Sequence, residues 1–461
     1  MNFSRLYNKL ILHIKSIDVF LLIFISLFTI DKVAAKPIMI VFGLACMWKY
    51  LSGRDIKGTP LFYVFIPLWG AVNFLLINTD FTKPHFIAFV IGFSYWLMSL
   101  FAFVIIRKRI EIKDPETLKR TLDTYFIINL LWSVGNLIYA MALSSSVNPY
   151  ALSGEAFGSS TGDFIKGLFM GPSYINMFVN AFFAIYYLYR GKYKMAIAAT
   201  TIAALTSSNF ANFVFVSTLI FLLFYLQQRR SRLTVLAQLS VFVIFYLIIS
   251  NSNLKYVTDT LRGTKGDVSE TRALNNIKLP FANQYPNAWY NKYGKAISFI
   301  QTYDYLKSSP VHFIFGAGIG EFSSQLAVRT SDLKVIKKSK LFELLPVYVA
   351  PSFFENHYQV FNTIYQLPPA YHSIRHFPSS FANQVLGEYG FVGLVLFFVF
   401  YLFYFLRRYK QLTFTLPMLA MLCCFLMFDY LFEYLSVVVF FELFFLIDLK
   451  HRTLNSSRIN A

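Results

Sequence analysis

The sequence is poor in cysteine and in charge: its 461 residues contain three cysteines, and charged residues make up only 14% of the chain. A disulfide framework is not expected, because the cysteines lie in apolar runs where each is best explained as a small buried side chain. The sequence also has no D-x-D pair, no Walker loop and no H-E-x-x-H spacing. These absences argue against a metal-bound nucleotide sugar, against coupling to ATP and against zinc-protease chemistry. We expect an activity that needs no metal and no other cofactor.

Hydrophobic side chains are what the sequence has in abundance. They make up 56% of the chain, and aromatic residues alone make up 19%, including 53 phenylalanines. Apolar runs near the roughly 20 residues that cross a bilayer as a helix recur along the chain, separated by short charged turns. The sequence therefore predicts an all-α polytopic membrane protein with about twelve transmembrane helices. The predicted spans are Ile17–Ile30, Pro37–Tyr50, Pro60–Asn78, His85–Ile106, Leu122–Leu143, Met170–Tyr189, Met195–Ser207, Phe210–Gln227, Thr234–Ser250, Gln384–Leu406, Gln411–Phe428 and Leu431–Ile447.

The placement of lysine and arginine predicts the orientation, because short loops rich in these residues stay in the cytoplasm. Basic clusters such as 107–109 and 407–410 alternate with short turns that hold few basic residues. This alternation favours an even number of spans and two cytoplasmic termini. The alternative at the N-terminus is a cleavable signal, since basic residues precede an apolar stretch that ends in small residues at 33–35.

Three segments follow from these spans: a membrane bundle over 1–250, a large periplasmic loop over 251–383, and a second membrane bundle with a cytoplasmic tail over 384–461. Most of the formal net charge of +19 reports orientation, but basic residues also outnumber acidic residues within the loop. A basic loop beside a membrane suits an anionic ligand or anionic lipid headgroups. A merely solvated loop is the alternative, and no nucleic-acid partner is expected.

Part of the loop, Asn291–Ser308, carries apolar residues at helical spacing. We expect an amphipathic helix that lies on the membrane or on the bundle, with Tyr303 on its apolar face and Lys295 on its polar side. A second helical candidate covers Ser331–Val349.

Two glycine-marked elements flank the second half of the loop, and their glycines are expected to let the backbone approach a neighbour or ligand closely. The run Gly316-Ala-Gly-Ile-Gly-Glu-Phe322 resembles a G-x-G-x-x-x-F segment of the O-antigen polymerase and O-antigen ligase superfamily. The run Gly387-Glu-Tyr-Gly-Phe-Val-Gly393 is similar to the E-x-G-x-x-G that opens the span after that family's large periplasmic loop. Further upstream, Lys166–Asn176 resembles the segment that begins the family's middle spans. Ligases of the family have a His-Asn pair where this chain has Ser379-Ser380, so the resemblance favours a polymerase.

The resemblance implies that a glycan is transferred from a polyprenyl pyrophosphate carrier to a hydroxyl of another glycan, without a nucleotide or a metal. The expected partners are the lipid-linked oligosaccharide, membrane lipid and a chain-length regulator protein. Ligation of finished glycan to lipid A-core or to a protein is one alternative. A polysaccharide flippase or transporter is the second, and a non-enzymatic component of an assembly machine is the third.

The implied chemistry assigns roles to particular residues. A leaving pyrophosphate needs cations, and the arginine fork matches it bidentately. The candidate substrate-binding residues are Arg262, Arg272, Lys295, Arg329, Arg375 and Glu388. The attacking hydroxyl needs a general base, for which we expect His376, then His372, because a histidine titrates near neutral pH. Each arginine has an ordinary ion-pairing role as its alternative, and Glu388 has the placement of the tenth span. Glu442, inside the last span, is expected to face the bundle and to be neutralised or paired.

Overall fold

The structure is a computed structural model that describes residues 14–30, 41, 43–45, 58–77, 82–151, 164–206, 209–248, 294–331, 333, 348–366, 377–427 and 429–459. Within these ranges the regular secondary structure is entirely helical, which confirms the all-α expectation. The helices before the large loop are α2 (Val19–Phe28), α4 (Phe62–Leu76), α5 (Lys83–Ile112), α6 (Pro115–Ser144), α7 (Ser173–Tyr189), α8 (Tyr193–Leu205), α9 (Asn209–Tyr225) and α10 (Arg229–Ile248).

The loop itself contributes short helices, and a third group follows it. The loop helices are α13 (Gly294–Ser308), α14 (Pro310–Phe315), α15 (Gln325–Thr330), α16 (Pro351–Phe353) and α17 (Gln359–Gln366). The helices after the loop are α18 (Phe381–Leu396), α19 (Phe403–Leu406), α20 (Thr415–Leu426), α21 (Leu431–Tyr434) and α22 (Ser436–Ile459). A π-helical stretch, Phe397–Leu402, joins α18 to α19.

Among the residues that the structure describes, four helical segments are long and apolar enough to cross a membrane: Pro84–Ile112, Pro115–Ser144, Arg229–Ile248 and Phe381–Gln411. Helices α2, α4, α8, α9 and α20 are apolar but shorter. Each predicted span coincides with a helix, except the second, Pro37–Tyr50, which lies mostly outside the described residues. The described part of the chain is therefore all-helical, with several helices able to cross a membrane.

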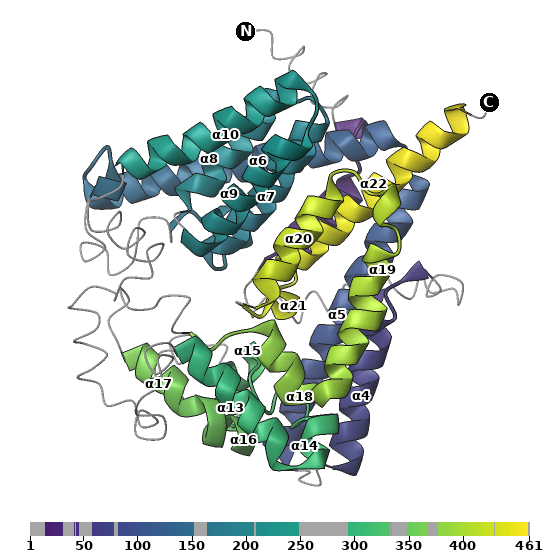
Figure 1. Ribbon diagram of the computed structural model, residues 1–461, viewed down its shortest axis with the longest axis vertical. Helices are drawn as coiled ribbons and strands as arrows, with labels where there is room; N and C mark the ends of the chain where they lie inside the picture. Colours follow the sequence, from purple (N-terminus) through teal and green to yellow (C-terminus); the bar gives the residue numbers. More distant parts are fainter. Residues whose placement is uncertain are drawn as a thin grey trace.

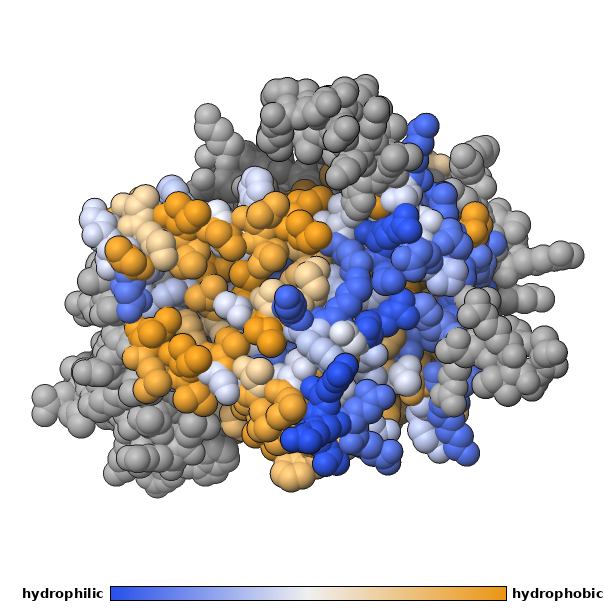
Figure 2. Space-filling view, turned by 90° about the horizontal axis from the view of Figure 1, so that it is seen from above, coloured by the Kyte–Doolittle hydropathy of each residue, from blue (hydrophilic) through white to orange (hydrophobic). Residues whose placement is uncertain are grey.

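The outer faces of α6, α9 and α10 are strongly hydrophobic. Leu131, Phe224 and Leu247 are 66%, 77% and 78% exposed. Figure 2 shows a broad hydrophobic area on one side of the molecule and a hydrophilic area on the other. An apolar area of this kind is unfavourable in water, but it fits helices whose outer faces contact lipid.

The helices form two packed groups with the loop helices gathered at one end. Figure 1 shows α6 to α10 together on one side, α4, α5 and α18 on the other, and α13 to α17 opposite the carboxyl end of α22. Contacts of α7 with α22 and of α9 with α20 join the two groups. Helices α13 and α14 pack on α18, and α15 packs on α5. The loop helices are thus anchored to the ends of membrane-length helices.

The charged residue of the last span, Glu442, is buried against tyrosines. The Tyr63 hydroxyl of α4 donates a hydrogen bond to its Oε1 at 2.5 Å, and the Tyr401 hydroxyl donates to the same oxygen at 3.4 Å. The residue is only 1% exposed. The expectation that Glu442 faces the bundle and is paired is confirmed, and its carboxyl group connects α4, the π-helical stretch and α22.

Two predicted spans that the sequence presents as continuous are interrupted near the loop helices. Helix α18 contains Gly390 at φ 64° and ψ −164°, which is not a helical conformation. Helix α21 ends at Tyr434 and α22 begins at Ser436. The residue between them, Leu435, has a φ of 63°. Because a positive φ is unfavourable for leucine, surrounding packing must hold this break. Leu435 is 2% exposed, which agrees with that requirement.

Candidate functional site

The two glycine-marked elements contact each other through their backbones. The Ala317 N–H donates to the Gly387 carbonyl at 2.8 Å, and the Gly318 N–H donates to the Glu388 carbonyl at 2.9 Å. Gly316 has a φ of 72°, and a Cβ placed on it would lie 2.5 Å from the carbonyl carbon of Glu388. The predicted close approach is therefore confirmed, and it joins the loop to α18.

The upstream element, Lys166–Asn176, forms a separate network of buried amides. The Gly167 N–H donates to Oδ1 of Asn136 at 3.0 Å. The Asn176 side chain donates to the Ile165 carbonyl at 3.1 Å. Because these bonds satisfy backbone groups at the start of α7, they fix where that helix begins. This element positions α7 and takes no part in the contact between the two glycine elements.

Lys295 lies at the start of α13, where the expected helix is confirmed and Ile297 and Leu306 are buried as predicted, but the placement of Lys295 and Tyr303 is wrong. Lys295 is only 7% exposed, whereas Tyr303 is 63% exposed. The inner face of α13 is partly polar because it packs on the polar start of α18: the Asn383 side chain donates to Oγ of Ser298 at 2.9 Å. The Lys295 ammonium donates to the Ser379 carbonyl at 2.5 Å. Burial lowers the pKa of Lys295 to about 7, although nearby Asp429 acts in the opposite direction.

Asp429 connects this lysine to the membrane helices. It lies between α20 and α21 and is buried, and the Tyr174 hydroxyl of α7 donates a hydrogen bond to its Oδ2. Burial raises the pKa of Asp429, and the bond from Tyr174 and the positive charge of Lys295 limit the rise. A residue from each of α7, α13 and the α20–α21 turn therefore meets at one polar junction.

Arg329 belongs to the surroundings of the same junction. It is partly buried in the last turn of α15, and its charge acts on the phenol of Tyr365 in α17. Burial raises the pKa of Tyr365 to about 12, the positive charge of Arg329 lowers it, and the negative charge of Asp429 raises it. Two of the predicted cations thus act on this group of residues: Lys295 on the Asp429 carboxylate and Arg329 on the Tyr365 phenol.

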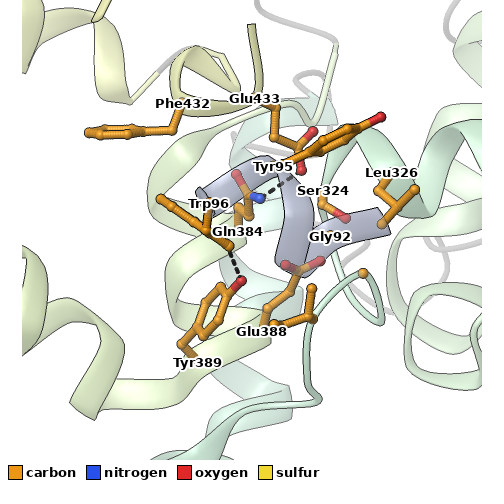
Figure 3. Close-up of a pocket in the computed structure, with 12 residues that line it drawn as sticks. Gly92, Tyr95, Trp96, Ser324, Leu326, Gln384, Glu388, Tyr389, Phe432 and Glu433 are labelled. Atoms are coloured by element: carbon orange, nitrogen blue, oxygen red, sulfur yellow. Dashed lines mark hydrogen bonds between the residues drawn. The ribbon is translucent and has the colours of Figure 1, made fainter. Parts of the chain in front are cut away.

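The first glycine element and the residues that follow it, 316–324, are called the glycine loop below. A small cavity lies where α5, α18, α21 and this glycine loop meet. Figure 3 shows the carboxyl groups of Glu388 and Glu433 entering this space from opposite sides, with Gln384 and Ser324 beside them. The Gln384 amide nitrogen donates to Oε1 of Glu433 at 2.8 Å. The cavity volume is about 10 Å³, which is room for one water-sized guest. Glu388 is 1% exposed, so it is a buried group and not a rim residue.

Two histidines that the sequence did not single out for chemistry are buried around the glycine loop. His357 lies within hydrogen-bonding distance of the Ser298 carbonyl, with Nε2 at 3.0 Å. Burial lowers the pKa of His357 to about 4, so its ring is neutral at neutral pH. His85 of α5 contacts Oε1 of Glu321 at 3.1 Å, and the Tyr348 hydroxyl donates to the same carboxylate at 3.0 Å. Both histidines support the docking of the loop helices.

The predicted site residues divide into two sets. Lys295, Arg329 and Glu388 are described and lie around the junction of loop and membrane helices. The other candidates, which lie outside the described residues, are Arg262, Arg272, Arg375, His372 and His376. Sequence analysis missed Tyr174, Asp429 and Glu433. The two carboxylates stand within the turn and short helix between two apolar runs, and acidic residues at such a boundary were the available signal.

Comparison of the chain with protein-family models, with curated proteins and with solved structures found no match. The functional conclusion therefore depends on the residues and on the geometry of the site.

Proposed function

We propose that the chain is a polymerase that joins polyprenyl-pyrophosphate-linked oligosaccharide repeat units into O-antigen, capsule or exopolysaccharide. In this proposal it spans a bacterial inner membrane twelve times with both termini in the cytoplasm. Residues 251–383 then lie on the extracytoplasmic face, where the carrier presents its glycan.

One observation supports the proposal most: the polar junction at Lys295. Lys295, Arg329 and Asp429 gather where the loop helices dock on apolar helices of membrane length. A lipid-linked anionic donor has its pyrophosphate at the membrane surface and its glycan outside it. Cations held at the loop–membrane junction are therefore placed at the height of the leaving group.

The chemistry requires no metal. An acceptor hydroxyl attacks the anomeric carbon of the donor glycan, and the bond from that carbon to the pyrophosphate oxygen breaks. The lipid pyrophosphate leaves with the electron pair, and the hydroxyl proton passes to a base, which we assign to His376 and, failing that, His372. Lys295 as an ammonium and Arg329 stabilise the negative charge that develops on the leaving group, together with Arg262, Arg272 and Arg375 of the same chain.

The test is reconstitution of the purified chain in liposomes with a lipid-linked repeat unit as the only substrate. We expect a ladder of polymer lengths, which Lys295→Met shortens or abolishes. Lys307→Met is the matched control, because Lys307 belongs to the same helix but is exposed. Single-repeat products from the wild-type chain, at normal protein content, would rule out a polymerase.

A deletion strain separates polymerization from ligation. Loss of a polymerase leaves surface glycan of a single repeat. Loss of a ligase leaves long lipid-linked polymer that never reaches its acceptor, and that result would replace the proposed polymerase with a ligase.

A transporter is the second candidate, and the interrupted helices favour it. Secondary transporters bind their substrates and coupling ions at discontinuous helices, and this chain has such breaks at Gly390 and Leu435. Movement of a lipid-linked glycan between leaflets of liposomes, without any polymer, would support the transporter and oppose the polymerase.

A further inference from the structure

The cavity beneath the glycine loop contains oxygen atoms that the protein leaves without hydrogen bonds. Oε1 of Glu388 and Oε1 of Gln384 are both buried and have no hydrogen-bonding partner among the described residues. Each of these two residues is 1% exposed, and both line the cavity. Because buried acceptors are normally satisfied, two of them around one small space indicate a missing donor or cation.

The charge around the cavity has the same implication. The charged group that acts most on Glu388 is Glu433, which has the same sign. Two buried carboxylates that face each other repel strongly unless they share a proton or positive charge lies between them. The Gln384 amide satisfies one oxygen of Glu433, but an amide carries no charge. A positive guest would offset the repulsion of both carboxylates.

We propose that this cavity is a binding site for one sodium ion, held by Glu388, Glu433 and the amide oxygen of Gln384. All three ligands are hard oxygen atoms, which suit an alkali-metal or alkaline-earth ion better than a transition metal. Calcium takes six to eight oxygen ligands and magnesium keeps several waters, and the 10 Å³ space accommodates neither shell. Sodium is small enough for the space, and ions of this kind bind where helices are interrupted.

The site also joins three parts of the fold. Glu388 and Gln384 come from α18, Glu433 from α21, and Ser324 from the end of the glycine loop. A bound ion therefore links the two interrupted helices to each other, directly beside the segment that docks the loop. Sodium should stabilise the folded chain as a whole, independently of any glycan substrate.

The experiment measures thermal unfolding of the purified chain in detergent as sodium chloride replaces choline chloride at constant ionic strength. We expect the midpoint to rise by several degrees and to saturate with sodium. Glu388→Gln should remove the response, and Glu433→Gln should weaken it. Glu355→Gln is the matched control, because Glu355 is exposed on the loop and should keep the full response.

If a variant folds poorly, titration of the wild-type chain with sodium still tests the proposed site. Equal midpoints in sodium and choline would overturn the proposal, as would an equal rise with potassium. Stabilization by acid alone, with no dependence on sodium, would show that the two carboxyl groups share a proton and would likewise remove the sodium site. A full sodium response in Glu388→Gln would exclude this cavity as its location.

Discussion

Lys295 provides the sharpest test of the site, because its burial opposes folding. Its pKa falls from an ordinary 10.5 to about 7. The unfolded chain therefore binds more protons than the folded chain between pH 7 and pH 10.5, so this residue destabilises the fold most at low pH and less as the pH rises. From those two pKa values the destabilization is about 5 kcal/mol at pH 6 and about 2 kcal/mol at pH 9.

Lys295→Met removes the ammonium group and keeps most of the side-chain volume. We expect the variant to unfold at a higher temperature than the wild-type chain, with a larger gain at pH 6 than at pH 9. In liposomes we expect polymer formation to fall by roughly two orders of magnitude, as for other groups that stabilise a developing charge. A residue that weakens the fold and yet supports activity is a functional residue.

The assay is scanning fluorimetry of both proteins at the two pH values, beside the polymer ladder. Lys307→Met is the control and should leave both the unfolding midpoint and the ladder unchanged. An Lys295→Met protein that is less stable than the wild type at pH 6, or whose gain is equal at both pH values, would refute the burial of a titrating ammonium.

Four further results are expected. Gly316→Ala should prevent accumulation of folded protein, because a Cβ there would lie 2.5 Å from backbone. Gly135→Ala is the control and should be tolerated, because no described atom lies within 4 Å of the added Cβ. Equal yields of the two variants would contradict the docking of the two glycine elements. Tyr303→Cys should react with a membrane-impermeant thiol reagent in intact spheroplasts and Lys194→Cys only after permeabilization, and the reverse pattern would invert the topology. His376→Ala should abolish transfer while the protein still accumulates. The wild type should lose stability as the pH falls from 6.5 towards 4, by roughly 3 kcal/mol in full, because only the unfolded chain protonates the His357 ring in that range. His357→Gln should abolish this pH dependence.

Hydrophobic length predicted the helices well, because an apolar run has few other ways to satisfy its backbone in lipid. The sequence also predicted that the glycine elements would approach a neighbour closely, although it did not indicate which one. The structure agrees, since Gly316 and Gly390 adopt positive φ angles that other residues avoid. The orientation of α13 was predictable only in part, because Ile297 and Leu306 are buried as expected but Lys295 is buried and Tyr303 is exposed. The helical wheel assumes that apolar residues face inward, but the surface that receives α13 contains Asn383 and the Ser379 carbonyl.

The acidic residues of the site show a second limit of sequence analysis. Asp429 lies between the last two predicted spans and Glu433 lies at the start of the last one, and acidic residues at such a boundary mark a position without indicating what they contact. Their significance comes from tertiary contacts with Tyr174 and Gln384, which are 255 and 49 residues away along the chain. The break at Leu435 has no local cause either, because leucine is a good helix former and only packing explains its positive φ.

The burial of Glu442 has a consequence for how the protein is made. Its two tyrosine partners, Tyr63 and Tyr401, precede it in the chain, so both are synthesised before α22 emerges. An unpaired carboxyl group such as that of Glu442 makes entry of a helix into lipid unfavourable, at a cost on the order of 3 kcal/mol. We expect α22 to enter the membrane beside helices that are already inserted and that offer two hydroxyl groups. Its insertion then depends on α4 having been inserted correctly earlier in synthesis.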